Sequence, residues 1–370
     1  MIYVFYNNDP LAHDLGGGAE HFRGLHRALL KSGLEFRLVG TKMQDLRIAP
    51  NIDYISKGSN FLIYYLALWR WFWLHRKQFR EGDVFHFHRN YAAWPKLALC
   101  PDIGRVLISY HNVTGRVLQG WLGRLASPLR RAMLHFERRA IALADAIVCV
   151  SNRDRKTLAD IVLREPFEKA GVIPAAYDSA LFEETEPGPP PVARCRDILL
   201  LGRISHQKNV PLAISTLERL HAIGETFRLT IAGDGEDSRQ LIRRIAESPV
   251  ASRITWLGCV PHDEVPAIIR DHGILLLTSR YEASPTVVKE ALRCMRPVVS
   301  TDVGDVPDWV ETGATGFICD NDPISLADGV LGAARLIETG GYRPTTRLDD
   351  LSEDAIMNRV MQIYRRLQAV

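Results

Sequence analysis

Short apolar segments alternate with helix-like segments along almost the whole chain, and this alternation stops once and then restarts. Before the interruption, β-rich runs fall at residues 2–6, 36–39, 84–88, 106–110 and 146–150. After it, similar runs fall at residues 198–201, 229–232, 254–257, 274–278 and 298–300. Strands that alternate with helices predict a parallel sheet with helices on both faces. The sequence therefore predicts an α/β protein with two Rossmann-like domains that face each other across a cleft.

The interruption at residues 183–197 is rich in proline and polar residues, which is typical of a linker. We therefore expect an N-terminal domain over residues 1–180, a linker over 181–197 and a C-terminal domain over 198–351. An amphipathic helix at about 352–370 is expected to pack back on the N-terminal domain. A length of 370 residues suits two domains that each bury a core.

Charge is unevenly divided between the two halves. Residues 1–180 carry 25 Lys and Arg against 16 Asp and Glu, whereas residues 181–370 carry 21 against 27. A basic first half suggests an anionic partner for it, such as a membrane surface, a phosphorylated acceptor or a nucleic acid. No nucleic-acid-binding module is recognisable, so we expect no nucleic acid as a partner.

Two stretches of the basic half, residues 61–77 and 116–139, combine apolar and aromatic residues with Arg and Lys. Such stretches resemble interfacial helices on anionic lipid, although core helices with a basic solvent face would look the same. The apolar run at 61–74 is too short to span a bilayer, which takes about 20 residues. The six cysteines form no C-x-x-C pair and the first residues do not resemble a signal peptide. We expect a cytoplasmic protein, peripheral on the inner face of the membrane.

A strand at 198–201 leads into the most informative segment of the chain. Gly202 and Arg203 follow this strand directly, and Lys208 comes five residues after the arginine. An Arg and a Lys beside a glycine suit a diphosphate, although two surface cations at a strand end would give the same pattern. A tight turn at Gly233 follows the next strand and could also approach a ligand.

The segment after the strand at 274–278 carries two glutamates and a helix start. Pro285 suits the first turn of a helix, which would leave the N–H groups of Thr286 and Val287 free to bind an anion. Glu282 and Glu290 would lie in the same cleft, where carboxylates suit sugar hydroxyls: Glu282 those of the transferred sugar and Glu290 those of the ribose. Glu290 could equally be an ordinary glutamate on a helix surface.

The order Gly-Arg-x4-Lys, Gly-Asp-Gly and Glu-x7-Glu, each after an apolar strand, resembles the retaining glycosyltransferases of family 4, also called glycosyl transferases group 1. The resemblance extends to the first half, at Gly16–Glu20, at the histidine-bearing strand ends around His86, His88 and His111, and at residues 145–151. It departs from the family pattern at Ala283 and Asp305, where the family often has glycine, and at Asp308, where it usually has glutamate.

The resemblance implies a GT-B fold and retaining transfer from a nucleoside diphosphate sugar, with UDP favoured over GDP, to a hydroxyl of a glycan or lipid-linked acceptor. It implies that Arg203 and Lys208 stabilise the departing diphosphate, that Glu282 holds the sugar and that His111 touches the sugar near its reacting carbon. Retention in this family is described as front-face attack without a protein nucleophile. The donor-binding residues that we expect are Gly17, Gly18, Gly202, Gly233, Gly258, Val260, Ser284, Pro285, Thr286, Val287 and Glu290.

We expect neither a metal nor another cofactor; the nucleoside diphosphate sugar serves as co-substrate. Asp320 and Asp322 have the Asp-x-Asp pattern of metal-dependent transferases but lie in a polar turn. The histidines at 86, 88 and 111 form no helical His-x3-His pair, so structural or substrate roles are expected.

Two other functions are compatible with parts of the pattern. A catalytically silent sugar-nucleotide-binding protein or partner subunit would fit the altered positions 283 and 305. A related GT-B enzyme, such as an epimerase or phosphorylase, is a weaker alternative. A nicotinamide-dependent oxidoreductase is not expected, because Gly16–Gly18 lacks the G-x-G-x-x-G spacing directly after the first strand. The sugar, the acceptor and the oligomeric state do not follow from the sequence.

Overall fold

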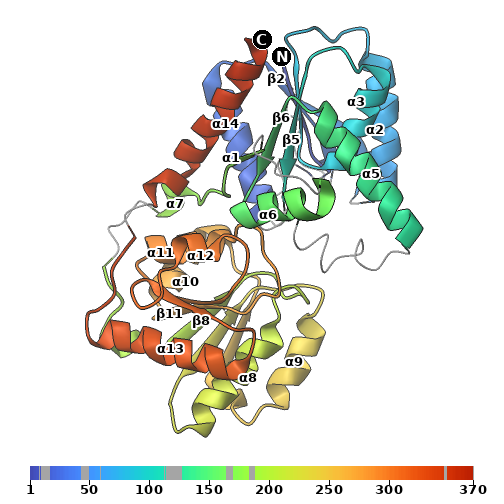
Figure 1. Cartoon of the computed structure of the whole chain (residues 1–370). Coiled ribbons are helices and arrows are strands. Elements are labelled where there is room, and N and C mark those ends of the chain that lie inside the picture. Colours follow the sequence, from blue (N-terminus) through green and yellow to red (C-terminus); the bar gives the residue numbers. More distant parts are fainter. Residues whose placement is uncertain are drawn as a thin grey trace. The chain divides into compact units, whose positions relative to one another are not determined.

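The computed structural model describes residues 1–7, 9, 17–42, 50–58, 60–111, 113, 127–163, 170–182, 188–345 and 348–369. The chain forms two compact units (Figure 1). Unit 1 comprises Met1–Ala175 together with Glu353–Val370, and unit 2 comprises Ala176–Ser352. Both contain a parallel sheet with helices, which confirms the predicted α/β class with two Rossmann-like domains.

The sheet of unit 1 has seven strands among the described residues, in the order β3-β2-β1-β4-β5-β6-β7. Each strand pairs with its neighbours in parallel. The strands are β1 (Ile2–Phe5), β2 (Phe36–Lys42), β3 (Ile52–Lys57), β4 (Val84–Phe87), β5 (Arg105–Tyr110), β6 (Ala146–Cys149) and β7 (Ala170–Val172).

Helices connect these strands, as a parallel sheet requires. They are α1 (Gly17–Ser32), α2 (Phe61–His75), η1 (Asn90–Ala93), α3 (Trp94–Leu99), α5 (Ser127–Leu143), α6 (Asn152–Thr157), η3 (Leu158–Leu163) and the last helix, α14 (Glu353–Gln368). The helix α14 packs beside α1 (Figure 1). Nε of Arg27 on α1 donates to Oε1 of Glu353 at 2.9 Å, so an ion pair joins the end of the chain to its first helix.

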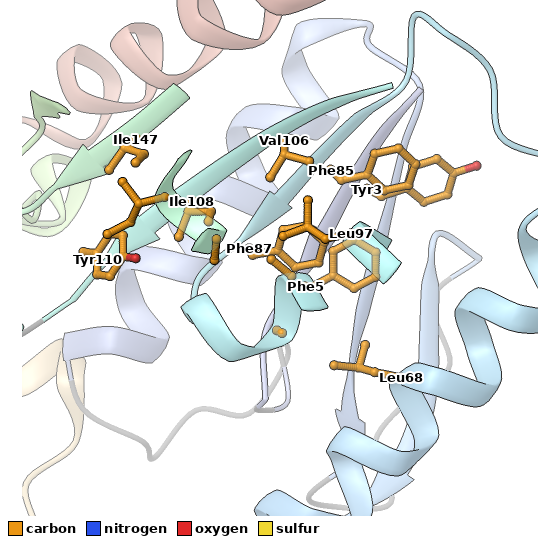
Figure 2. Close-up of a cluster of buried hydrophobic side chains, with 14 of the residues drawn as sticks. Tyr3, Phe5, Leu68, Phe85, Phe87, Leu97, Val106, Ile108, Tyr110 and Ile147 are labelled. Atoms are coloured by element: carbon orange, nitrogen blue, oxygen red, sulfur yellow. The ribbon is translucent and has the colours of Figure 1, made fainter. Parts of the chain in front are cut away.

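Aromatic side chains dominate the core of unit 1. Tyr3, Phe5, Phe85 and Phe87 come from the adjacent strands β1 and β4, and Figure 2 shows them beside Leu68 of α2 and Leu97 of α3. The rings of Phe5 and Phe87 stack with centroids 4.6 Å apart. Successive strand residues alternate between the two faces of the sheet, so these rings share one face and leave His86 on the other.

The sheet of unit 2 has six parallel strands among the described residues, in the order β10-β9-β8-β11-β12-β13. The strands are β8 (Asp197–Leu201), β9 (Arg228–Ala232), β10 (Ile254–Gly258), β11 (Ile274–Leu277), β12 (Val298–Thr301) and β13 (Gly316–Cys319). Aliphatic residues form its core, with Ile198, Leu229 and Ile274 each at most 1% exposed.

The helices of unit 2 follow the same alternation. They are α7 (Ser179–Phe182), η4 (Val192–Arg194), α8 (Val210–Ala222), α9 (Ser238–Ala246), η5 (Ala251–Arg253), η6 (His262–Glu264), α10 (Val265–Arg270), α11 (Thr286–Arg293), α12 (Val306–Trp309), α13 (Pro323–Glu338) and η7 (Asp349–Leu351). No helix in the described part of the chain is long and apolar enough to cross a bilayer.

Each sheet reverses its strand order once, between β1 and β4 in unit 1 and between β8 and β11 in unit 2. Loops that leave the two strands on either side of such a point diverge and leave a crevice at the carboxyl ends of the strands. Ligands of doubly wound sheets bind there, so the side chains at these two switch points are the ones that bear on function.

Candidate functional site

Lys208 and Glu282 lie together at the switch point of unit 2, on the loops that leave β8 and β11. Nζ of Lys208 is 2.7 Å from Oε1 of Glu282. Ser279 Oγ donates to the same oxygen at 2.8 Å, and Gln207 Nε2 donates to Oε2 at 3.1 Å. The carboxylate is therefore held by three neighbours, which fixes its position. The sequence had identified Lys208 and Glu282 but not the supporting Gln207 and Ser279.

Two glycines at this end of the sheet permit an approach that no other residue would allow. Gly233 has φ 139°, and a Cβ there would lie 2.0 Å from the carbonyl oxygen of Gly202. Gly202 has φ 143°, and a Cβ there would lie 3.3 Å from Cε of Lys208. The ends of β8 and β9 can thus lie against each other directly beside the lysine.

Arg203 lies at the outer side of the same loop. Its side chain is 65% exposed, and its Nε is 3.9 Å from Oε2 of Glu236 in the turn after β9. Lys208 is only 19% exposed. The two cations that the sequence had grouped thus pair with different carboxylates, and only Lys208 is enclosed.

The helix α11 begins at Thr286, and Pro285 precedes it with no side chain that caps the first N–H groups. Glu290 lies on the same helix and is 6% exposed. Burial raises the pKa of Glu290 to about 7, while a hydrogen bond from the Thr286 side chain opposes the shift. The alternative that Glu290 is an ordinary surface glutamate is therefore wrong, since the side chain is buried.

A buried ion pair that the sequence did not reveal supports the start of α11. Nζ of Lys289 is 3.1 Å from Oδ2 of Asp305, and the two side chains are 0% and 2% exposed. Ser284 Oγ donates to the same Oδ2 at 2.6 Å, and Trp309 Nε1 donates to it at 3.0 Å. The backbone N–H of Asp305 also donates to the carbonyl of Ala283 at 3.1 Å. The predicted site residue Ser284 is thus held to the loop after β12, and two of the three departures from the family pattern, Ala283 and Asp305, contact each other.

Gly258 is the last residue of β10 and Val260 follows this strand, at the far side of the Gly233 turn. The carbonyl of Gly258 accepts a hydrogen bond from the N–H of Gly233 at 2.7 Å, and Trp256 Nε1 donates to the carbonyl of Gly233 at 2.8 Å. Val260 is half-buried. These residues border the same sheet end, beyond β9 from the Lys208 pair.

Histidines gather at the switch point of unit 1. His88 follows β4 and His111 follows β5, and His88 Nδ1 lies 2.9 Å from His111 Nε2. His86 bonds to the hydroxyls of Tyr364 at 2.6 Å and Ser109 at 2.7 Å. Burial lowers the pKa of His86 to about 3 and holds those of His88 and His111 well below the usual value. Among these histidines, the sequence had predicted a catalytic role only for His111.

Gly17 and Gly18, which the sequence predicts as donor-binding residues, are the first two residues of helix α1. His21 is in the next turn of that helix, and its ring centroid is 5.5 Å from that of His111. The neighbouring Gly16 lies outside the described residues.

The Asp-x-Asp turn has a structural explanation. Asp322 precedes α13, and its Oδ1 accepts hydrogen bonds from the N–H groups of Ile324 at 2.9 Å and Ser325 at 3.0 Å. An aspartate that caps a helix in this way satisfies donors that the helix leaves open.

The two predicted interfacial stretches differ in how much of them the structure describes. Residues 61–77 contain α2, whose buried face consists of Tyr64, Leu68, Trp71 and Phe72. Its opposite face leaves large apolar side chains 48–60% exposed, namely Phe61, Leu62, Ile63, Leu66, Trp73 and Leu74. Of residues 116–139, those up to 126 lie outside the described residues, and α5 follows with Leu134 buried and Phe136 54% exposed.

Comparison with known families matches two complementary halves of the chain. Residues 15–181 match the family described as Glycosyltransferase Family 4, and residues 186–336 match that described as Glycosyl transferases group 1. The second match contains every predicted site residue of unit 2, and the first contains His111, Gly17 and Gly18.

Individual relatives are more distant. The phosphatidylinositol N-acetylglucosaminyltransferase gpi3 subunit of Schizosaccharomyces pombe is 32% identical over 46% of this chain and 37% of its own length. Glycogen synthase of Mycobacterium tuberculosis is 27% identical over 64% of this chain and 56% of its own length. The 2-deoxystreptamine glucosyltransferase of Streptomyces kanamyceticus is 28% identical over 62% of either chain. The matches thus span between about a third and three fifths of these relatives.

Solved structures share the fold at lower identity. Sucrose-phosphate synthase of Thermosynechococcus elongatus superposes with a TM-score of 0.79 at 20% identity, over 100% of this chain and 99% of the other. A glycosyltransferase of Rickettsia africae gives 0.70 at 15% identity, over 99% of this chain and 98% of the other. The two α/β units of this chain therefore have the GT-B fold.

Proposed function

This chain belongs to the group 1 glycosyltransferases, and we propose that it moves a sugar from a nucleoside diphosphate sugar to a hydroxyl acceptor with retention of the anomeric configuration. We favour UDP over GDP as the carrier. The acceptor would be a glycan or a lipid-linked acceptor, in polysaccharide, glycan or glycolipid biosynthesis. Relatives named for phosphatidylinositol and for glycogen support this range of acceptors.

The observation that carries the proposal is the enclosed pair of Lys208 and Glu282 beside the open start of α11. An ammonium group and uncapped helix N–H groups provide positive charge for a diphosphate. Glu282 and the buried Glu290 provide acceptors for hydroxyl groups of the sugar and the ribose. A ligand with adjacent anionic and polyhydroxyl parts would match both.

In the proposed reaction, the bond between the anomeric carbon and the diphosphate oxygen breaks while a bond to the acceptor oxygen forms on the same face. The proton of the acceptor hydroxyl passes to the departing phosphate oxygen, so no protein nucleophile is needed. Lys208, with Arg203 at the rim, would stabilise the charge that grows on the diphosphate. His111 remains a predicted contact of the sugar.

We propose that transfer requires neither a metal nor a further cofactor. Nζ of Lys208 provides the charge that a divalent cation supplies in metal-dependent transferases, and Asp322 is engaged as a helix cap. Measured turnover should therefore survive treatment with a chelator.

A silent sugar-nucleotide-binding protein or partner subunit is the second candidate, because Ala283 and Asp305 replace residues that are often glycine in the family. The Lys289–Asp305 contact argues for the enzyme, since it preserves the loop at Ser284 despite the replacement.

Turnover separates the two candidates. The purified full-length chain is incubated with UDP- and GDP-sugars, and release of the nucleoside diphosphate is followed with Lys208→Ala, Glu282→Gln and the control Arg335→Ala, which alters an exposed residue of α13. Loss of one such charge-stabilising group is expected to lower kcat about 10²–10³-fold, while the control retains the wild-type rate. Binding of a sugar nucleotide without turnover would instead identify the silent protein.

We further propose that the exposed face of α2 binds the inner, anionic surface of a membrane. Leu62, Leu66 and Trp73 are 60%, 60% and 55% exposed, and two cations are also exposed, Arg70 on the helix and Lys77 just after its end. Arg76 lies over the ring of Trp73 at 4.7 Å. Apolar side chains bordered by cations fit a lipid surface with negative headgroups.

Vesicle flotation tests this proposal. The protein should float with anionic vesicles at low salt, and Leu62→Ser/Leu66→Ser should reduce the bound fraction severalfold, whereas Leu30→Ser, at an exposed leucine of α1, should not. Equal flotation of all variants, or none with wild type, would refute it. If wild type is a dimer and the double variant is a monomer, the exposed face of α2 binds a second copy of the chain instead.

A further inference from the structure

The geometry points to a divalent transition-metal site formed by His21, His88 and His111 in unit 1, with zinc as the expected ion. One nitrogen from each ring can be chosen so that the three atoms lie within 4.8 Å of one another. The residues come from α1 and from the ends of β4 and β5, at the switch point of the sheet. The spacing of these three histidines in the sequence does not predict that they lie close together.

The distances require only side-chain movement to hold an ion. Zinc binds imidazole nitrogens at about 2.0–2.1 Å in a tetrahedral arrangement, which puts the nitrogens about 3.4 Å apart. His88 Nδ1 and His111 Nε2 already lie 2.9 Å apart. A cavity of about 10 Å³, which is about the space of a single water, borders His21 and His111.

The donor set selects the class of ion. Three imidazoles without a carboxylate favour zinc, copper or nickel over magnesium and calcium, which prefer oxygen ligands. His88 Nε2 is buried and has no hydrogen-bond partner within the described part of the chain. When Nε2 carries the ring proton, Nδ1 of His88 carries the lone pair of the neutral ring and can bind a metal in place of its contact with His111 Nε2.

The neighbours of His88 hold its ring in place, whereas His21 and His111 are less buried. The ring of His86 lies 4.2 Å from that of His88, and His86 is itself held by Tyr364 and Ser109. His21 and His111 are each half-buried. Three protein ligands leave a fourth position, which in zinc sites is open to water or another ligand.

The ion would act as an inhibitor of the proposed transfer. A metal that binds His111 removes this imidazole from any contact with a sugar. Binding itself does not depend on the proposed function, because the site lies within unit 1 and is measured without a sugar nucleotide.

Zinc binding to the full-length chain, stripped with a chelator and dialysed, tests the site by calorimetry. His26→Gln is the matched control, since His26 lies on α1 as His21 does and instead approaches Asn51 at 3.4 Å. We expect one zinc ion per chain, binding about tenfold or more weaker in His21→Gln and in His111→Gln, and wild-type binding in His26→Gln. Cobalt should give the intense visible absorption of a tetrahedral ion in wild type and in the control only.

Two variants keep the result interpretable if one of them misfolds, and circular dichroism of each variant identifies that case. The site is refuted if wild type binds no zinc, or if well-folded His21→Gln and His111→Gln both bind zinc as tightly as wild type. Equal weakening in His26→Gln would also refute it, because the effect would then not be specific to the three histidines.

Discussion

The two sheet switch points present opposite electrostatics on the same kind of scaffold. In unit 2, oppositely charged side chains lie in pairs, as in Lys208–Glu282 and Lys289–Asp305. In unit 1, the clustered histidines are kept neutral by burial, and the pKa of His86 falls to about 3. The same position in the fold thus offers fixed charge in one unit and uncharged nitrogen lone pairs in the other.

This difference suggests different ligands for the two ends. Fixed charge at the end of unit 2 suits an anionic diphosphate, whose oxygens it can stabilise. Neutral imidazoles in unit 1 suit a metal ion, which binds a nitrogen lone pair. They also suit the hydroxyl groups of a carbohydrate, with which they can form hydrogen bonds without placing a positive charge in a buried site. Four measurements test this difference between the two units, and the one with the largest expected effect comes first.

Mild acid should destabilise unit 1 more than unit 2. The pKa values of His86, His88 and His111 are lowered in the folded state, so their contribution is present above the usual pKa of about 6.5 and is lost as the pH falls below it. At pH 5 the loss is about 2 kcal/mol per histidine. Pulse proteolysis in urea with chelator present, with peptides assigned to each unit, should show the midpoint of unit 1 falling between pH 7 and 5. An unchanged midpoint would contradict the neutral cluster.

Lys289→Met should destabilise unit 2 by about 3–5 kcal/mol, because it leaves the carboxylate of Asp305 buried without its partner. The double variant Lys289→Met/Asp305→Asn removes both charges and should recover much of the loss. Urea unfolding followed by circular dichroism measures both. If the single and double variants are equally unstable, the charge pair is not what supports the Ser284 loop.

Gly233→Ala should cost about 3 kcal/mol, from backbone strain and from the approach of its Cβ to the carbonyl of Gly202. Gly224→Ala is the matched control, since Gly224 has φ 90° but nothing within 4 Å of an added Cβ. It should cost about 1 kcal/mol. Equal unfolding free energies for the two variants would show that the close packing of β8 and β9 is not required.

Glu290→Gln should change stability in the opposite pH sense to the histidines. Burial raises the folded pKa of Glu290 to about 7, so its stabilising protonation is complete below about pH 4.5 and is lost as the pH rises through 7. The variant should therefore gain on wild type between pH 5 and 8, by about 1–3 kcal/mol. Unfolding curves at several pH values measure the difference, and parallel curves for the two proteins would contradict it.

Much of unit 2 could be predicted from the sequence because its candidate site residues lie in the segments that follow its strands. Gly202, Lys208, Glu282 and Glu290 occur at fixed offsets after apolar runs, and the fold brings those runs to one edge. The partners Gln207, Ser279, Lys289 and Trp309 were missed, since their roles depend on side-chain packing that no spacing records.

The histidine cluster shows where such prediction stops. His88 and His111 share a strand-end pattern, but their approach to His21 depends on how α1 packs over the sheet. The helix α2 is a similar case: its composition left a core helix and an interfacial helix equally possible, and the structure shows one buried face and one exposed apolar face.

The central claim, that the switch point of unit 2 binds a nucleoside diphosphate sugar, is tested most directly by thermal shift in buffer with chelator. Wild type and Lys208→Ala are compared across UDP- and GDP-sugars. A ligand that binds only the folded state stabilises it by about 2.7 kcal/mol at a hundred times its Kd, so a UDP-sugar should raise the Tm of wild type and leave Lys208→Ala nearly unchanged. Equal shifts in both proteins, or no shift with any nucleotide sugar, would contradict the account.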